Sequence, residues 1–369
     1  MMDYIRRWML GLVGLLAGLL VACGGETATQ PSVTNGSDTP QFGGQTLTLV
    51  THDSFAVSTE VISGFEQLTG AKIQILEAGD AGAALNKSIL AAGAPLGDVQ
   101  FGVDNTFLSR ALAANIFVPY EPKNLNQVAG DLKLDPQNRL IPIDYGYVTI
   151  NYAKAALNAA KLPMPTDLRD LTKPEWRAKL VVQNPATSSP GLAFLLATID
   201  HFGENGDYTW HEFWRDLRAN DIKVTAGWED AYYGQFAGGG NDGTYPLVVS
   251  YATSPAASVI FSTTPLTDAP TGNLLLPGGT FRQIEFAGIL QGTKNPALAQ
   301  AWMDYMLDEA FQSDVGGQMF VYPVLPTASV PADFATYAQV PAITTTLTPD
   351  QIAQHRDRWI SEWTEIVLR

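Results

Sequence analysis

Cysteine is almost absent from this chain, which has one, Cys23, among 369 residues. A lone cysteine cannot close an internal disulfide, so the fold must be held by an apolar core, which the 46% of hydrophobic residues can supply. Histidine is also scarce, and the four histidines form no cluster with cysteine, which argues against a structural zinc site. We therefore expect neither a disulfide framework nor metal ligands.

Basic residues are few as well. Lys and Arg number 22 against 37 Asp and Glu, so the formal net charge is −15. An acidic surface of this kind argues against nucleic acid or anionic lipid as a partner and favours the approach of cations. The length of the chain predicts two domains rather than one.

Recognisable catalytic motifs are missing too. The chain has no glycine–x–serine–x–glycine sequence that would present a nucleophilic serine. Gly238-Gly239-Gly240 is not followed by Lys-Ser/Thr, so it indicates a flexible loop rather than a phosphate cradle. No metal-binding spacing connects the histidines, which are His52, His201, His211 and His355. We expect no catalytic residues, and hence a protein that is not an enzyme.

The first residues present a targeting signal. Arg6 and Arg7 precede an apolar stretch over 9–20, and the stretch ends in Leu20-Val21-Ala22-Cys23. A basic start, an apolar centre and small residues before a cleavage point are typical of a secretory signal. The last four residues resemble a bacterial lipobox, in which the cysteine is acylated and becomes the new first residue. The alternatives are a buried thiol, or a membrane helix, for which the stretch is short.

We therefore predict a lipoprotein signal peptide over 1–22 and a lipidation site at Cys23. The mature protein would be exported and lipid-anchored to a membrane, in the periplasm or on the outer face of the cell membrane. Residues 23–44 contain almost nothing to bury and predict a disordered tether. Flexible-coil scaling gives roughly 20 such residues a typical reach of about 25 Å, enough to hold a globule off the membrane.

Strands and helices alternate after the tether. Thr46-Leu47-Thr48-Leu49-Val50 alternates like a strand with one polar face, and a helical pattern follows that ends at Gly70. Further strands are predicted over 72–76 and 98–103, with a helix over 83–92 between them. This alternation predicts a parallel sheet, whose ligand crevice lies outside the carboxyl ends of the strands. Polar side chains at such ends are His52, Asp53, Asp80 and Asp104.

Two extended segments interrupt this alternation. Ile141 to Tyr147 predicts a crossing segment, a second strand–helix series covers 148–276, and 281–286 predicts a return crossing. One helix is expected over 296–311. A last helix begins at Thr348-Pro349-Asp350, which provides a cap, a first-turn proline and an acidic first turn.

The sharpest local signal is the segment from Gln183 to Gly191. Hydroxyl groups there precede Pro190 and an apolar helix, so a helix begins at this point. Free backbone N–H groups, with the hydroxyls of Thr187 and Ser188, suit a phosphate, carboxylate or hydroxyl of a ligand. A simple capping motif would fit the same residues.

Aromatic residues gather in the second half of the chain. Trp228 follows a strand predicted over 222–225, and Tyr251 ends one predicted over 247–250. Rings at strand ends can stack on a flat heterocycle and attract a cation, although each could equally pack in the core. With Asp53 and Asp80 available in the crevice, the pattern favours an aromatic, positively charged ligand. The other aromatic residues of this group are Tyr232, Tyr233, Phe320 and Tyr322.

Several short segments, taken in order, resemble the thiamine-binding lipoproteins and periplasmic proteins of ABC importers, from Leu47 to about Arg369. The segments with the most specific match are His52-Asp53-Ser54-Phe55, Asp144-Tyr145-Gly146-Tyr147, Asn184 to Gly191, Gly227 to Tyr232, Ser250 to Ala256, and Trp359-Ile360-Ser361-Glu362-Trp363.

The resemblance implies an α/β, two-lobed type II periplasmic binding protein fold. Each lobe would be a mostly parallel sheet flanked by helices, and two hinge crossings would join the lobes. Lobe 1 would comprise 45–142 and 282–318, and lobe 2 would comprise 143–281 and 319–369. The protein would be a monomer that captures thiamine or a thiamine phosphate and delivers it to an ABC permease and its ATPase. The vitamin would be the transported ligand, and no cofactor is implied.

The resemblance also assigns ligand-binding roles. Trp228 and Tyr251 match contacts in the cleft, and Asp80 matches a carboxylate near the ligand. Thr187 and Ser188 match the hydroxyl pair that receives the hydroxyethyl or phosphate end. Phe320 stands where the family has tryptophan, and Ala257 stands where it has tyrosine. The remaining ligand-binding candidates are His52 and Asp53.

Two other functions are weighed against this one. The adjacent Tyr232 and Tyr233 could indicate a ferric-ion carrier of the same fold, but neighbouring residues on a helix would not both face the cleft. A thiamine-cleaving enzyme would need a nucleophilic cysteine, and Cys23 is already committed to the lipid.

Overall fold

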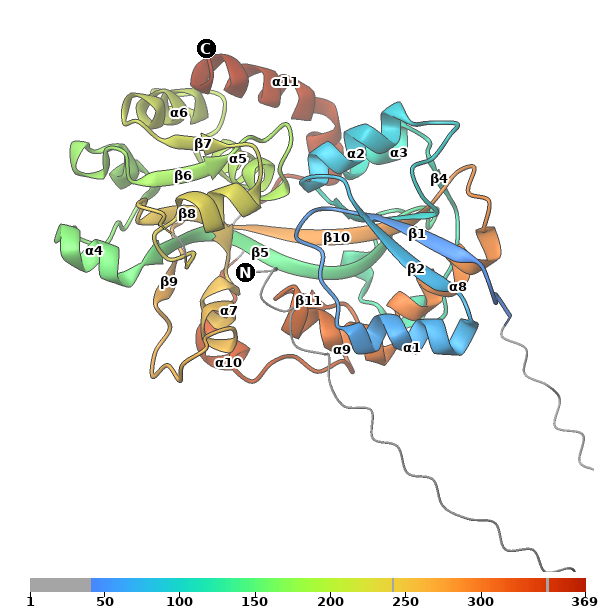
Figure 1. The fold of residues 1–369 in the computed structure, drawn as a ribbon. Coiled ribbons are helices and arrows are strands. Elements are labelled where there is room, and N and C mark those ends of the chain that lie inside the picture. Colours follow the sequence, from blue (N-terminus) through green and yellow to red (C-terminus); the bar gives the residue numbers. More distant parts are fainter. Residues whose placement is uncertain (1–40, 241, 343–344) are drawn as a thin grey trace, which may run out of the picture. The chain divides into compact units, whose positions relative to one another are not determined.

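Two long strands cross the middle of one mixed sheet (Figure 1). They are β5 (Ile141–Ala153) and β10 (Phe281–Leu290), which pair antiparallel from Phe281↔Val148 to Ala287↔Ile141. The computed structural model describes residues 41–369 with the exception of 241 and 343–344. The strand order is β2-β1-β3-β10-β5-β8-β6-β7, so the two expected crossings are present and join two parallel halves.

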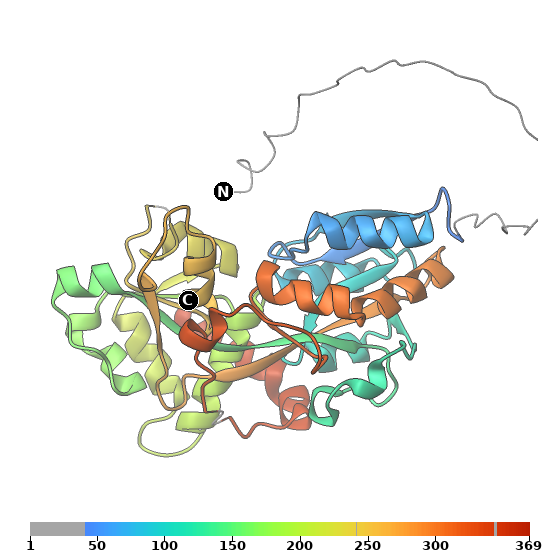
Figure 2. The same ribbon diagram turned by 90° about the horizontal axis from the view of Figure 1, so that it is seen from below.

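The first half contains three parallel strands, β1 (Thr46–Thr51), β2 (Lys72–Glu77) and β3 (Val99–Asp104). Figure 2 shows helices on both sides of these strands. The helix after β1 starts at the cap Ser58, whose hydroxyl accepts from the N–H of Val61, and stops at Gly70 in the left-handed conformation, as expected. The helices of this half are α1 (Thr59–Thr69), α2 (Ala81–Leu90), α3 (Leu108–Ala113), α8 (Pro296–Met306) and α9 (Glu309–Gln318).

The second half is built from the parallel strands β6 (Leu180–Gln183), β7 (Lys223–Thr225) and β8 (Leu247–Tyr251). A π-helical turn at Asp230–Gln235 follows β7. The helices here are α4 (Lys154–Ala160), α5 (Ser189–Phe202), α6 (Trp210–Ala219), α7 (Ser254–Ile260) and α10 (Phe334–Tyr337). Short strands β4 (Phe117–Val118), β9 (Thr271–Leu274) and β11 (Tyr322–Pro323) pair with the crossing strands. Short 3₁₀ helices occupy Leu125–Gln127, Gly130–Leu132, Leu168–Thr172 and Pro174–Trp176.

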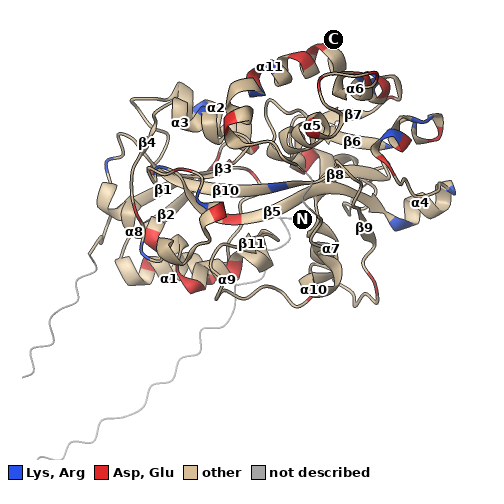
Figure 3. Cartoon of the chain, turned by 180° about the vertical axis from the view of Figure 1, so that it is seen from behind, with Lys and Arg blue, Asp and Glu red and all other residues tan. Residues whose placement is uncertain are grey.

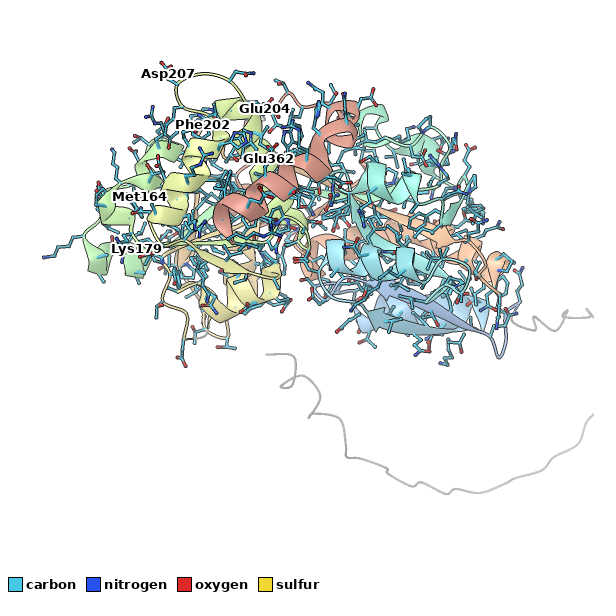
Figure 4. The ribbon with its side chains drawn as sticks, turned by 90° about the horizontal axis from the view of Figure 1, so that it is seen from above. Met164, Lys179, Phe202, Glu204, Asp207 and Glu362 are labelled. Carbon is cyan, nitrogen blue, oxygen red and sulfur yellow. The ribbon has the colours of Figure 1, made fainter. Side chains whose placement is uncertain are left out.

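The last helix, α11 (Pro349–Val367), touches both halves. Thr348 caps its start, as the sequence predicts, and also forms a capping box with Gln351. Trp363 is fully buried against Trp214 of α6, at 5.5 Å between ring centroids. Figure 4 shows Glu362 of α11 near Phe202 and Glu204 at the end of α5. The guanidinium of Arg356 lies 4.4 Å from the ring centroid of Phe107, which precedes α3.

Three boundaries differ from the sequence-based expectation. The helix expected over 296–311 is two helices, because Asp308 between α8 and α9 is extended (ψ 154°). The helix α2 begins at Ala81, two residues early, because the Asp80 carboxylate caps it. The expected tether is too long at its end, because Phe42 is buried and its N–H donates to the carbonyl of Thr69.

Acidic side chains are spread over the described helices in Figure 3, and Lys and Arg are fewer. Among residues that the structure describes, no helix combines the length and apolarity that a membrane crossing needs. The predicted signal peptide, Cys23 and nearly all of the predicted tether lie outside the described residues.

Candidate functional site

The two halves of the protein contact each other at the start of α2. The Asp80 carboxylate accepts a hydrogen bond from its own helix, through the N–H of Ala81 (2.6 Å), and one from the N–H of Trp228 in the other half (2.8 Å). The N–H of Ala83 donates to the carbonyl of Thr187, also in the other half (3.2 Å). A single carboxylate therefore both caps a helix and joins the two halves.

Glycine permits this close approach. A Cβ on Gly82 would lie 2.9 Å from the carbonyl carbon of Thr187 and 2.6 Å from the ring of Phe107. A Cβ on Gly227 would lie 3.0 Å from a carboxylate oxygen of Asp80. Sequence reasoning missed Gly82, because nothing local distinguishes it from an ordinary helical glycine.

Aromatic rings form one wall of the contact. Trp228 stacks on Tyr232 at 5.0 Å, and its ring centroid is 6.1 Å from that of Tyr251. The indole N–H of Trp228 donates to the hydroxyl of Ser250 (2.8 Å), and the hydroxyl of Tyr251 donates to Gln283 (3.3 Å). The structure thus brings together Asp80, Trp228 and Tyr251, three of the predicted ligand residues.

The electrostatics of this contact are dominated by burial and by carboxylates. Burial raises the pKa of Asp80, while the hydrogen bond from Trp228 and the nearby hydroxyl of Ser188 oppose the shift. Burial, followed by the charges of Glu285 and Asp80, raises the pKa of Tyr251 well above its usual value. The tyrosine is therefore a neutral hydrogen-bonding group at physiological pH.

His52 and Asp53 lie beside this contact, after β1. The N–H of Asp53 donates to Gly79 (3.2 Å). Nδ1 of His52 accepts from the N–H of Ser54 (3.2 Å), and its Nε2 lies 3.5 Å from a carboxylate oxygen of Glu285. Burial alone lowers the pKa of His52, but the neighbouring carboxylates, Glu285 foremost, make the net shift upward.

The helix α5 begins where the sequence predicts, and the hydroxyl groups at its start have different partners. The hydroxyl of Thr187 donates to the carbonyl of Ala226 (2.6 Å). Ser188 is the N-cap of α5, is fully buried, and makes no side-chain cap bond. The hydroxyl of Ser189 donates to the carboxylate of Asp104.

Phe320 lies in a different apolar cluster. Its backbone has a positive φ of 58°, and its ring packs against Phe261 at 4.8 Å between centroids. The same cluster holds Phe334 of α10, and Ala257 packs against it. The structure therefore does not place Phe320 with the rings of Trp228 and Tyr251.

A row of acidic side chains crosses the sheet below these residues. Asp104 on β3, Glu285 on β10 and Asp144 on β5 are register partners on three adjacent strands. Exposed fractions are 0% for Asp104 and Asp144 and 7% for Glu285. Sequence reasoning placed Asp104 in the crevice but missed the other two. Their signal is a single carboxylate within each crossing segment.

Two cavities lie away from this contact. One of about 360 Å³ is lined by Ser88, Asn115 and Gly292, among others, and one of about 290 Å³ is lined by Asp200, His355 and Trp359, among others. The hydrogen bonds from Trp228 to Asp80 and from Ala83 to Thr187 close the junction of the halves.

The two tyrosines weighed for iron both contact Trp228. Tyr232 is stacked on its indole, and the ring of Tyr233 lies edge-on to it at 5.5 Å. Within the described residues, no group of three or more His, Cys, Asp or Glu side chains is arranged to hold a metal ion.

Comparison with known proteins identifies the family. The profile of a bacterial extracellular solute-binding protein family matches residues 94–345. The chain belongs to this family. Thiamine-binding periplasmic proteins of Salmonella typhimurium and Escherichia coli are 33% and 31% identical to it, over 89% of this chain and 96% of each relative. The iron uptake protein A2 of Synechocystis is 26% identical over 66% of this chain and 69% of the relative.

Solved structures agree with the family assignment. A periplasmic thiamin binding protein, 29% identical, superposes with a TM-score of 0.75 over 88% of this chain and 96% of that chain. Ferric ion-binding protein A of Pasteurella haemolytica, 18% identical, covers 87% of this chain and 98% of its own with a TM-score of 0.67, which is likeness of fold alone. The resemblance to thiamine-binding periplasmic proteins and the α/β type II periplasmic binding protein fold are thus confirmed. The relatives are solute-binding transport proteins rather than enzymes.

Proposed function

We propose that this protein is an extracytoplasmic lipoprotein that captures thiamine or a thiamine phosphate between its lobes and delivers it to an ABC importer. The observation that carries the proposal is the hydrogen bond from Trp228 to Asp80. It joins the two halves beside the rings of Trp228 and Tyr251. The two thiamine-binding periplasmic relatives support this choice of ligand.

The ligand's chemistry matches the groups at this junction. Thiamine has a permanently charged thiazolium ring, a flat aminopyrimidine and a hydroxyethyl arm. Aromatic faces attract a cation and stack on a flat ring, and a carboxylate complements the positive charge. We propose that Trp228 and Tyr251 bind the rings, that Asp80, Asp53 and His52 lie near the charge, and that Thr187 and Ser188 at the start of α5 receive the arm. Phe320 would contact the ligand only after its cluster rearranges.

Capture would use the hinge formed by the crossings β5 and β10. The halves touch through Asp80 and Trp228, and through Ala83 and Thr187, so a ligand must enter when these contacts separate. Two-lobed binding proteins close around their ligands by this kind of hinge motion. We propose lobes of 45–142 with 282–318, and of 143–281 with 319–369.

Calorimetric titration of ligand-stripped protein tests the proposal. Thiamine, thiamine monophosphate and thiamine diphosphate should be titrated in parallel. Ferric citrate should be added in a separate experiment that records visible absorption. Saturable binding of at least one thiamine compound supports the proposal. Heat from none of them, or a tyrosinate–iron absorption band, would contradict it. Incubation with thiamine should release no thiazole.

The anchor is a separate part of the proposal. We propose that Cys23 carries lipid, and that the protein acts as a monomer beside its permease and ATPase. A Cys23→Ser variant should lose incorporation of labelled palmitate and leave the membrane fraction. Incorporation that persists in this variant would disprove acylation at Cys23.

A further inference from the structure

The acidic row beneath the proposed thiamine site is an unusual concentration of buried charge. Asp104, Glu285 and Asp144 face one another in register across adjacent strands. On β10, Arg282 alternates with Gln283 and therefore faces away from the row, where it pairs with Asp131 (2.7 Å). Three carboxyl groups thus share a desolvated space on one face of the sheet.

The charges around the row do not balance three carboxylates. From β1 comes His52, 3.5 Å from Glu285, and from α2 comes Asp80, another acid. From β8 comes the neutral hydroxyl of Tyr251, whose pKa is raised by burial and then by Glu285. From α11, Arg356 contributes a positive charge toward Asp104, although its guanidinium donates to Asp357. From α5 and from the turn after β3 come only hydroxyl and amide donors, those of Ser189, Thr106 and Phe107 to Asp104.

Protons bound to the carboxyl groups of the row therefore compensate for the missing positive charges. Burial raises the pKa of Asp104 to about 7, against the hydrogen bonds from Thr106. Burial, and then the charge of Glu285, raises the pKa of Asp144 well above its usual value. Like-charged carboxyl groups that share a dry site hold a proton between them.

Two buried polar groups at the site lack ordinary partners. Neither carboxylate oxygen of Asp144, which is 0% exposed, accepts a hydrogen bond from a nitrogen or hydroxyl donor, and its one polar neighbour is the carboxyl group of Glu285. The hydroxyl of Ser188, on a different element and also 0% exposed, forms no hydrogen bond of regular geometry, although it lies near Asp80. Buried polar atoms are almost always satisfied, so two such groups from different elements near one junction point to a ligand that satisfies them.

We propose that Asp104, Glu285 and Asp144 form the charge-selecting floor of the binding site, and that a cationic ligand takes the place of a proton there. The O–H bond of one carboxylic acid breaks, its proton goes to the buffer, and the carboxylate left behind faces the thiazolium charge. This inference rests on the proposed function, because it assumes that thiamine binds at this junction. Since the thiazolium charge is permanent, affinity should increase with pH until the floor has lost its proton.

Comparison of two ligands tests charge selection in the unmodified protein. Thiamine and deazathiamine, a neutral isostere in which carbon replaces the thiazolium nitrogen, should be titrated at pH 7. The floor predicts at least about tenfold tighter binding of thiamine, because a buried opposite charge favours the cation. Titrations in HEPES and in Tris, which differ in ionisation enthalpy, should show that a proton is released with thiamine and not with deazathiamine.

Variants separate the floor from the general acidity of the protein. Glu285→Gln and Asp144→Asn should reduce both the preference for thiamine over deazathiamine and the proton release. Asp131→Asn also removes one negative charge, but on the opposite side of β10. It should leave both the preference for thiamine and the proton release unchanged. Thermal unfolding identifies any variant that fails to fold. The comparison of thiamine with deazathiamine in the unmodified protein does not depend on such a variant.

The outcomes distinguish this inference from the proposed function. If thiamine does not bind at all, the proposed function fails. If thiamine binds, but deazathiamine binds equally well and no proton is released, the function stands and the charge-selecting floor is wrong. If Asp131→Asn changes the preference as much as Glu285→Gln does, the selection is a property of overall charge and the floor is again wrong.

Discussion

Replacing Asp80 with asparagine separates the two tasks of this side chain. One carboxylate oxygen accepts from Ala81 at the start of α2, and the other accepts from Trp228 in the opposite half. Asparagine keeps an oxygen for the helix cap, and it caps helices about as well as aspartate. Its amide group then faces the N–H of Trp228, so donor meets donor and the contact between the halves is lost.

The size of the effect follows from the contact that is removed in the complex, where the ligand takes the place of Trp228 as the partner of the Asp80 carboxylate. A hydrogen bond to a charged group contributes about 1.5–3 kcal/mol, and each 1.4 kcal/mol is about tenfold in affinity. Asp80→Asn should therefore weaken thiamine binding by about 10- to 100-fold. Its free energy of unfolding should exceed that of Asp80→Ala by about 1 kcal/mol, because alanine also loses the cap.

Titration calorimetry with thiamine and urea unfolding of both variants provide the measurements. Unchanged affinity in Asp80→Asn would show that the junction of the halves is not used in binding. Equal loss of stability in the two variants would show that the cap formed by Asp80 does not stabilise α2.

Three further predictions concern the ring wall, the acidic row and the start of the fold. Trp228→Ala should weaken thiamine binding by more than about 1 kcal/mol in calorimetry, a typical value for a desolvated cation–π contact, and unchanged affinity would refute that role. Folding raises the pKa of Asp104 from 3.8 to about 7. The folded protein therefore loses stability as the pH rises between these two values. Asp104→Asn should flatten urea-measured stability between these pH values, and an unchanged slope would assign the effect elsewhere. Phe42→Ala should lower the free energy of unfolding by about 3 kcal/mol, as for other buried phenylalanines, whereas no loss would mean that the fold begins after it.

Local patterns predicted the helices and strands well, because their determinants are local. Ser58 and Gly70 bound α1 through a side-chain cap and a left-handed backbone. The crossings at 141–147 and 281–286 were recognisable because proline, glycine and alternation mark extended chain. The break between α8 and α9 was missed, because no proline or glycine marks it in the sequence and the residue at the break is Asp308.

The candidate site was harder to predict, because it depends on contacts between distant segments. The carboxylate of Asp80 was expected to face a ligand, but its partners are the N–H groups of Ala81 and Trp228, which lies 148 residues away. Phe320 was assigned by resemblance to the cleft, and in the structure its ring packs against Phe261, in a different cluster from Trp228. The pairing of Asp144 with Glu285 follows from strand register, which sequence patterns alone do not specify.

A crystal structure of the protein with bound thiamine tests the central claim most directly. The account predicts the thiazolium and pyrimidine rings between Asp80 on one side and Trp228 with Tyr251 on the other. The ligand would then replace the direct hydrogen bond from Trp228 to Asp80. Thiamine found elsewhere, for example in the cavity beside Ser88, with that hydrogen bond intact, would contradict the account.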